Sequence, residues 1–162
     1  QPDILTGGKA LGGGTPIGFF STTDAIAASY TKPGASTFGG NPVTATAGLA
    51  FLRVLQRDGL VERAARIGGT LKDMLTGLAK RFDIIREVRG LGLMLGVELG
   101  EKAGRTPAEM TDQVLELMKD AGFLLGKTGP GRNVLTFMPP LIIGESELQR
   151  GVDTLESILR AI

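Results

Sequence analysis

The spacing of apolar residues along the chain predicts helices and strands in alternation. Apolar positions recur every three to four residues in several long stretches, as expected for amphipathic helices. Helices are expected over residues 42–55, 60–78, 107–121 and 145–162, with a shorter one over residues 24–30. Short apolar runs predict strands over residues 16–21, 84–88, 91–99, 123–125 and 133–138, with a turn at Arg89 and Gly90. This order of elements predicts a mixed sheet packed against helices.

Capping residues mark where these helices begin and end. Asn41 followed by Pro42 is typical of a helix N-terminus, with asparagine as the cap and proline at the first helical position. Residues 106–109, Thr-Pro-Ala-Glu, form a capping box, and Gly122 ends the helix that follows. The buried stripe of that helix is expected to comprise Met110, Val114, Leu117, Met118 and Ala121.

Glycines interrupt the two helices expected over residues 42–78. Asp58 and Gly59 separate them, which predicts either two packed helices or one long bent helix. Gly68 and Gly69 lie inside the second helix, and each weakens it by about 1 kcal/mol relative to alanine.

The overall composition is that of a folded protein with nearly balanced charges. The chain has 162 residues, of which 42% are hydrophobic and 22% charged, and its net charge is +1. These values argue against intrinsic disorder and against electrostatic capture of nucleic acid. No apolar run is long enough to cross a bilayer, so neither nucleic acid nor membrane is expected as a partner. The expected location is the cytoplasm.

The chain contains no cysteine and no histidine, which narrows its possible chemistry. Disulfides, thiol catalysis and cysteine-ligated metal are excluded, and so are Ser-His and Cys-His catalytic pairs. The commonest metal ligand is missing, and no metal site is expected. Any catalysis therefore depends on lysine, on carboxylates or on a bound cofactor.

A single lysine stands among glycines near the start of the chain. Residues 1–18, QPDILTGGKALGGGTPIG, place Lys9 between Gly7-Gly8 and the run Gly12–Gly14. Glycine permits close backbone approach, so such a loop can wrap a bulky group. A lysine amine held there can attack a carbonyl and form an imine if its surroundings lower its pKa. Taken alone, the same pattern also fits an ordinary flexible surface lysine.

A second glycine-rich segment follows at residues 34–42, GASTFGGNP. Ser36 and Thr37 supply hydroxyls, and two glycines let backbone N–H groups converge just before a helix N-terminus. Such a turn is a plausible anion site. The simpler interpretation is a capped helix after a loop.

Taken together, these motifs resemble the class III pyridoxal-phosphate-dependent aminotransferases. The resemblance rests on PDILTGGKALGGGTPIG, then STFGGNP about thirty residues later, then VRGLGLMLGVEL at residues 88–99, and it runs through essentially the whole chain. It implies pyridoxal 5'-phosphate as cofactor and Lys9 as the Schiff-base lysine. It also implies that Ser36 and Thr37 contact the cofactor phosphate, Thr37 usually that of the neighbouring subunit of a homodimer.

The resemblance also implies a fold and a place within a longer protein. The fold would be a fragment of the fold type I α/β architecture. Residues 1–42 would end the large cofactor-binding domain, residues 43–81 would form linker helices, and residues 82–162 would form a small C-terminal α+β domain. In the family, the preceding part carries an aspartate for the pyridinium nitrogen and an aromatic that stacks on the ring. The chain is therefore expected to be a C-terminal fragment, inactive by itself.

Two arginines and one threonine bear on the substrate. Arg89 has a planar fork suited to a carboxylate, although a structural role in ordering its turn is the alternative. Arg132 lies in the loop over residues 128–133 and is either a substrate contact or a solvated side chain. Thr136 stands where several relatives carry an arginine that grips the substrate carboxylate. Threonine cannot form that ion pair, which favours an ω-amine or alanine-type donor.

The activity implied for the parent protein is transfer of an amino group from an amine or amino acid to a 2-oxo acid. The resemblance assigns Lys9 the roles of Schiff-base former, general base and general acid. Three alternatives stay open. They are another fold type I activity such as an aminomutase, decarboxylase or racemase, a folded module for dimerisation without catalysis, and an anion-binding module built on the Thr37 turn.

Overall fold

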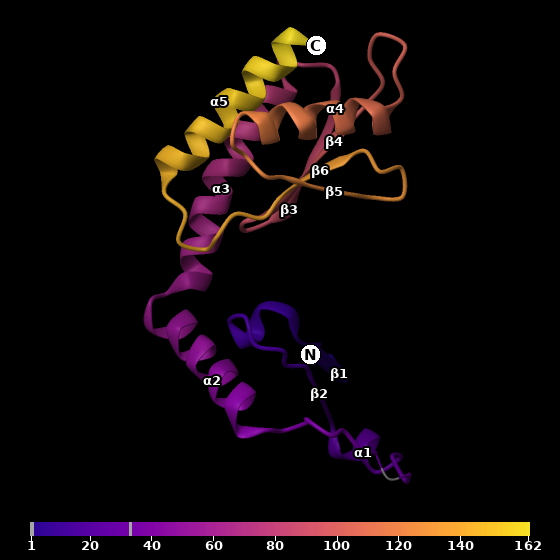
Figure 1. Cartoon of the computed structure of the whole chain (residues 1–162), viewed down its shortest axis with the longest axis vertical. Helices are drawn as coiled ribbons and strands as arrows, with labels where there is room; N and C mark the ends of the chain where they lie inside the picture. Colours follow the sequence, from indigo (N-terminus) through magenta and orange to yellow (C-terminus); the bar gives the residue numbers. More distant parts are fainter. Residues whose placement is uncertain (1, 33) are drawn as a thin grey trace. The chain divides into compact units, whose positions relative to one another are not determined.

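A computed structural model describes residues 2–32 and 34–162 (Figure 1). The chain divides into two compact units, a first unit over residues 1–59 and a second unit over residues 60–162. The division falls at Gly59, which has a left-handed backbone with φ of 58° and separates two long helices. This confirms two helices rather than one bent helix. The division of residues 1–81 into a domain end and linker helices stays a prediction.

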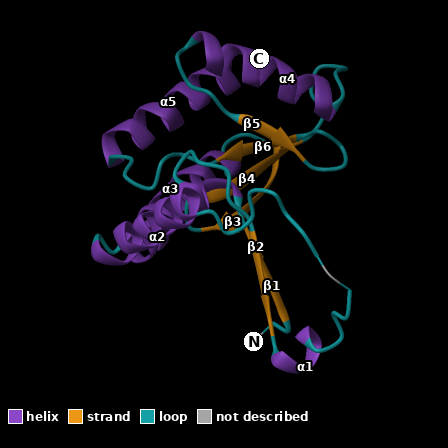
Figure 2. Ribbon diagram, turned by 60° about the horizontal axis from the view of Figure 1, so that its bottom comes forward, coloured by secondary structure: helices purple, strands orange, loops and turns teal. Residues whose placement is uncertain are grey.

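The first unit is built from a two-stranded ribbon and three helical segments. Its elements are β1 (Ile4–Gly7), a 3₁₀ turn η1 (Lys9–Gly12), β2 (Phe19–Thr22), α1 (Asp24–Ala27) and α2 (Pro42–Arg57). The strands β1 and β2 pair antiparallel from Ile4 opposite Thr22 to Gly7 opposite Phe19, and Figure 2 shows them as one narrow ribbon. The sequence analysis expected β2 but no strand at β1. Helix α2 packs against η1.

The capped start of α2 confirms the expected N-terminus. The backbone N–H of Thr44 donates to the Asn41 side-chain oxygen over 3.1 Å, and Pro42 occupies the first helical turn. Such a cap satisfies one of the backbone donors that a helix start leaves open. The loop before α2 is thereby fixed to the helix that follows it.

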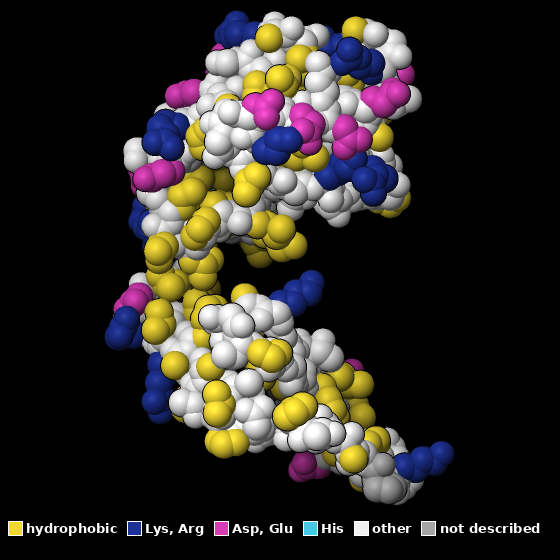
Figure 3. All heavy atoms as spheres, viewed as in Figure 1, with side chains coloured by type: hydrophobic (Ala, Val, Ile, Leu, Met, Phe, Trp, Pro, Cys, Tyr) yellow, Lys and Arg dark blue, Asp and Glu magenta, His cyan; other side chains and the backbone are white. Residues whose placement is uncertain are grey.

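The first unit buries few side chains. Only Gly12 and Gly48 are buried among its described residues. Most of its large apolar side chains are exposed, namely Ile4, Leu5, Phe19, Phe20, Tyr30, Phe38, Val43, Leu49, Leu52 and Val54, and the others are half-buried. On the face drawn in Figure 3, this unit shows mostly apolar and uncharged atoms, whereas charges of both signs are spread over the second unit. Taken by itself, the first unit therefore has no core of large side chains.

The second unit is an antiparallel sheet with helices on one face. It comprises α3 (Leu60–Ala79), β3 (Ile85–Leu91), β4 (Met94–Leu99), α4 (Pro107–Asp120), β5 (Gly126–Thr128), β6 (Val134–Phe137) and α5 (Glu145–Ala161). The strand order is β3-β4-β6-β5. Along β4, Leu95, Val97 and Leu99 are buried in one core with residues of all three helices. The alternate residues, Met94, Gly96 and Glu98, face the other side and are partly or fully exposed.

The hairpin turn lies three residues later than the sequence analysis expected. Arg89 and Gly90 are both inside β3, and the turn consists of Gly92 and Leu93. Gly90 has a φ of 129°, and a Cβ there would overlap the carbonyl oxygen of Met94 on the paired strand. Glycine is therefore required at position 90 because the two strands pair closely there. In the sequence, such a glycine looks the same as one that marks a turn.

Two further expectations around α4 are wrong. The strand expected over residues 123–125 is a connecting segment, because Phe123 packs against Gly151 of α5 and pairing with β6 begins only at Gly126. Leu117 and Ala121 were expected in the buried stripe of α4 but are exposed, Leu117 to 37%, and Thr111 is buried instead. The capping box at Thr106 and Glu109 is present as expected.

No helix in the described part of the chain is long and apolar enough to span a membrane. The cytoplasmic location expected from the sequence stays a prediction.

Candidate active site

Lys9 lies in a tight turn between the two strands of the first unit. It has a φ of 54°, in the left-handed region that residues other than glycine seldom adopt. The turn is held by backbone bonds from Leu11 N to Gly8 O and from Gly13 N to Ala10 O, of 3.2 and 2.9 Å. The Lys9 side chain is exposed. A hydrogen-bonded turn thus presents the exposed primary amine of Lys9.

A pocket of about 460 Å³ within the first unit joins the two motifs identified in the sequence. It is lined by Lys9, Pro16, Ile17, Gly18, Ser36, Phe38, Gly39, Gly40 and Thr44. Lys9 comes from η1, Ser36 from the glycine-rich loop, and Thr44 from the first turn of α2. Residues far apart in sequence therefore place an amine, two hydroxyls and a helix N-terminus around one space.

The loop before α2 requires glycine at positions 39 and 40. A Cβ at Gly39 would lie 2.8 Å from the Ser36 Cβ, and Gly40 has a φ of 71°. Backbone groups at a helix N-terminus carry partial positive charge and suit a phosphate. An amine at one side of the pocket and hydroxyls near a helix N-terminus at another fit a carbonyl-bearing phosphate ester such as pyridoxal phosphate.

Of the predicted cofactor contacts, the structure gathers Lys9 and Ser36 but not Thr37. Thr37 is exposed and does not line this pocket. Sequence reasoning did not single out Thr44, although its position in the first turn of a capped helix was a usable signal. Among the described residues, no group of acidic side chains is arranged to hold a metal ion.

The two predicted substrate arginines both belong to the second unit, in different settings. Arg89 Nη1 lies 2.5 Å from Glu87 Oε2 and 2.6 Å from Glu98 Oε2. The two carboxylates raise the pKa of the Arg89 guanidinium, Glu98 most strongly, and Arg89 lowers the pKa of the Glu98 carboxyl. Arg132 is exposed in the turn between β5 and β6, with a φ of 50°. Arg89 and Thr136 line one pocket, and Arg132 does not line it.

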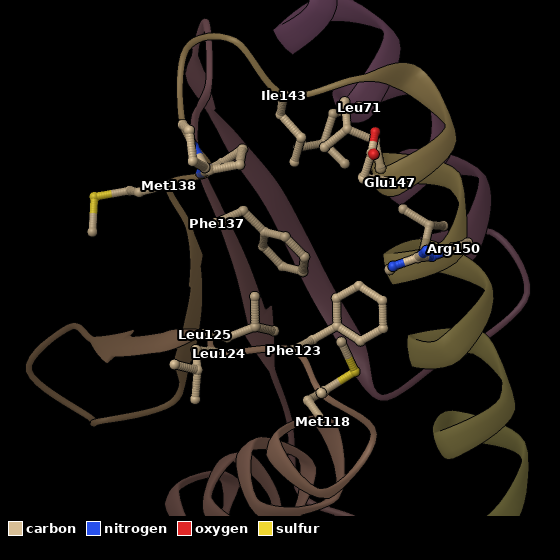
Figure 4. Close-up of a pocket in the computed structure, with 16 residues that line it drawn as sticks. Leu71, Met118, Phe123, Leu124, Leu125, Phe137, Met138, Ile143, Glu147 and Arg150 are labelled. Atoms are coloured by element: carbon tan, nitrogen blue, oxygen red, sulfur yellow. The ribbon is translucent and has the colours of Figure 1, made fainter.

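A second, more apolar pocket of about 290 Å³ lies elsewhere in the second unit (Figure 4). Phe137 points into it from β6, and Phe123 from the segment after α4. Glu147 and Arg150 of α5 are its charged lining residues, and both are exposed. The Arg150 guanidinium lies over the Phe123 ring at 5.9 Å.

Comparison with known proteins decides the family. Residues 1–159 match the family model described as aminotransferase class-III. The chain belongs to the class III aminotransferases. Members of this family use pyridoxal phosphate in general. The match of the family model over nearly the whole chain confirms the resemblance seen in the motifs.

Curated class III aminotransferases are similar to the chain along almost its full length. The chain is 42% identical to alanine–glyoxylate aminotransferase 2 homolog 2, mitochondrial, of Arabidopsis thaliana, over 96% of this chain and 33% of that protein. It is 41% identical to the acetylornithine aminotransferase of Mycobacterium leprae, over 99% of this chain and 37% of that protein. The chain thus spans about a third to two fifths of the length of these relatives.

Solved class III aminotransferase structures have the same fold. A phospholyase from Arthrobacter in complex with phosphoethanolamine superposes with a TM-score of 0.93 and 32% identity, over 100% of this chain and 39% of that one. The acetylornithine aminotransferase from Elizabethkingia anophelis superposes with a TM-score of 0.85 and 31% identity, over 100% and 42%. These matches confirm the expected α/β fold type I aminotransferase class.

Proposed function

We propose that the protein containing this chain transfers an amino group from an amine or amino acid to a 2-oxo acid, with pyridoxal phosphate bound at Lys9. The observation that carries the proposal is the pocket in which the Lys9 turn, the Ser36 loop and the first turn of α2 meet. Membership of the class III aminotransferases supports it.

Lys9 has two tasks in this proposal. Its Nζ would hold the carbonyl carbon of the cofactor, and as a free amine the same atom acts as base and acid for the proton of the donor carbon. When bound, pyridoxal phosphate supplies an electron sink for the charge left at that carbon. The backbone bonds around η1 fix the turn from which the flexible lysine side chain extends.

The loop before α2 would hold the phosphate. Ser36 contributes a hydroxyl, and the start of α2 contributes backbone N–H groups and the side chain of Thr44. Thr37, which is exposed outside this pocket, is assigned to the phosphate of a neighbouring subunit. The proposal includes a homodimer, and the exposed apolar side chains of the first unit offer surface for such a contact.

The two arginines differ as candidate substrate contacts. The Arg89 charge is engaged by two carboxylates, which supports a structural role in the sheet. Arg132 forms no ion pair within residues 2–32 and 34–162 and is the freer candidate for an acidic substrate group.

Covalent labelling of the full-length enzyme tests the proposal. Pyridoxal phosphate is added, the imine is reduced with borohydride, and the modified peptide is mapped. We expect one adduct, on Lys9. Lys9→Ala should abolish it and lower amino transfer to a 2-oxo acid by at least about a hundredfold.

Lys32→Ala is the matched control, since Lys32 is an exposed lysine of the same unit that does not line the pocket. It should leave labelling and turnover unchanged. Near-normal activity of Lys9→Ala would refute the assignment.

A lyase is the second candidate, because the superposition with a TM-score of 0.93 is with a phospholyase in complex with phosphoethanolamine. The two activities differ in what they consume. A transaminase uses the 2-oxo acid stoichiometrically, whereas a phospholyase releases inorganic phosphate from phosphoethanolamine without it. Measuring both products in the same reaction separates the two, and an aminomutase or decarboxylase would give neither result.

A further inference from the structure

The turn that carries Lys9 packs on helix α2 at small residues. Gly12 of η1 and Gly48 of α2 are the buried residues of the first unit within residues 2–32 and 34–59. A Cβ at Gly48 would lie 3.7 Å from the carbonyl oxygen of Leu11, which also belongs to η1. The helix and the lysine turn therefore approach each other where neither glycine carries a side chain.

Ile17 fills the space beside these two glycines. A Cβ at Gly12 would lie 3.0 Å from Ile17 Cγ2, and a Cβ at Gly48 would lie 3.2 Å from Ile17 Cδ1. Isoleucine branches at Cβ, so the directions of its two arms are fixed together. The half-buried side chain of this one residue thus contacts the lysine turn with one arm and α2 with the other.

The place of the turn on α2 depends on such packing. The backbone hydrogen bonds of η1 join residues of the turn to one another, from Leu11 to Gly8 and from Gly13 to Ala10. They fix the shape of the turn but not its distance from the helix. Ile17 also lines the pocket that contains Lys9, so a change in its packing acts close to the amine.

We propose that Ile17 is a positioning residue for Lys9, because its side chain sets the distance between the lysine turn and α2. The inference rests on the proposed function, since it concerns the same amine. A displacement of about 1 Å at a reacting group can cost about a hundredfold in rate. The fit of Ile17 against Gly48 therefore affects the chemistry, although Ile17 takes no part in proton transfer.

A volume-conserving exchange tests whether this fit matters. Ile17→Val removes Cδ1, the atom that faces Gly48, and Gly48→Ala adds one methyl group on the other side of the same gap. In the double variant the new Cβ would lie 3.7 and 3.9 Å from atoms of Leu11, which are ordinary contact distances. The two changes together restore the packed volume, and such exchanges are tolerated best.

The first measurement is the rate at which pyridoxal phosphate modifies Lys9 in the full-length protein, with the imine trapped by borohydride. We expect Ile17→Ala to slow this rate by about fivefold or more and Ile17→Val by about threefold. Adding Gly48→Ala to Ile17→Val should bring the rate back to within about 1.5-fold of the native one.

Gly69→Ala is the matched control for adding a methyl group to a helix. A Cβ at Gly69 would meet no atom within 4 Å, and Gly69 belongs to α3 of the second unit. This variant should leave the modification of Lys9 unchanged.

Turnover gives a second readout that a loss of stability alone would not reproduce. Ile17→Ala should lower kcat by about tenfold and change the KM of the amine donor by less than about threefold, because a displaced amine affects proton transfer more than binding. Thermal melting shows whether each variant folds. Ile17→Val and the double variant keep the test decisive if Ile17→Ala does not fold.

The outcomes separate this inference from the proposed function. If pyridoxal phosphate does not modify Lys9 of the native protein, the proposed function is refuted. If it modifies Lys9 of Ile17→Val at the native rate, or if Gly48→Ala does not restore a slowed Ile17→Val variant, the proposed function stands and the positioning role of Ile17 is overturned.

Discussion

Gly68 lies where α3 touches the turn of the β3–β4 hairpin. A Cβ at Gly68 would overlap the backbone of Gly92, whereas a Cβ at the next residue, Gly69, would meet no atom within 4 Å. The sequence shows both as glycines that weaken a helix, with nothing to tell them apart. Packing decides that one is required and the other is only tolerated.

Exchanging each glycine for alanine measures this difference. Gly69→Ala should raise the free energy of unfolding by about 0.5–1 kcal/mol, because alanine favours the helix and nothing obstructs it. Gly68→Ala should lower it by about 1–3 kcal/mol, because α3 must move away from the hairpin. Chemical denaturation compares the two variants, and equal effects would contradict the contact between Gly68 and Gly92.

At the scale of an element, α4 begins with contacts that are entirely local. Glu109 accepts a hydrogen bond from the backbone N–H of Thr106 over 2.8 Å and one from the Thr106 hydroxyl over 2.7 Å. The backbone bond most strongly, and then the hydroxyl bond, lowers the pKa of the Glu109 carboxyl below its ordinary value. The capping box could be predicted from the sequence because all its members lie within four residues.

The lowered pKa gives this helix start a defined pH dependence. Because the pKa of Glu109 is lower in the folded protein than in the unfolded chain, its contribution to stability is present above the unfolded pKa. It is lost as the pH falls through the lower, folded value. Glu109→Gln should therefore destabilise the protein at about pH 7 and much less at about pH 3.

Asp120→Asn is the control at the other end of α4, where a negative charge opposes the helix dipole. This variant should not lower stability at about pH 7. Unfolding curves of both variants at the two pH values check the prediction, and a pH-independent loss in Glu109→Gln would argue against it.

At the scale of the whole molecule, the two units differ in what holds them together. The second unit has a continuous core, with Leu75, Leu78, Val97, Leu135 and Leu155 fully buried. The first unit exposes most of its large apolar side chains and buries none of them fully, and a ribbon of two strands is marginal by itself. Burial of apolar area is the main stabilising term in folding, so the second unit is the more stable one.

Hydrogen exchange of the chain should reveal this difference. Amides of β4, β6 and the middle of α3 should exchange at least about a hundredfold more slowly than those of β1 and β2. Mass spectrometry of exchanged peptides measures the rates. Equal protection of the ribbon and of β4 would show that the first unit is stabilised by contacts beyond its own.

Part of the candidate site could be predicted because some of its residues lie in short sequence motifs. Lys9 and Ser36 lie in glycine-rich motifs whose spacing carries the family resemblance, and both line one pocket of the first unit. Their roles stay predictions. Thr44 was not singled out from the sequence, although its place in the first turn of a capped helix was a usable signal. Within residues 2–32 and 34–162 the buried Thr136 hydroxyl has no hydrogen-bond partner, which could not be foreseen because the residues paired with it, Gly96 and Gly126, are distant in sequence.

The sequence by itself determined the features that depend on neighbouring residues: the helices, their caps, the glycine-rich lysine loop and the family. The tertiary structure alone decided the hairpin turn at Gly92, the late start of β5 and the need for glycine at position 68. It also decided that Arg89 is engaged across the hairpin by Glu98 of β4, in addition to Glu87 of its own strand. Those outcomes follow from contacts between distant segments, and a local pattern of residues does not record which segments will meet.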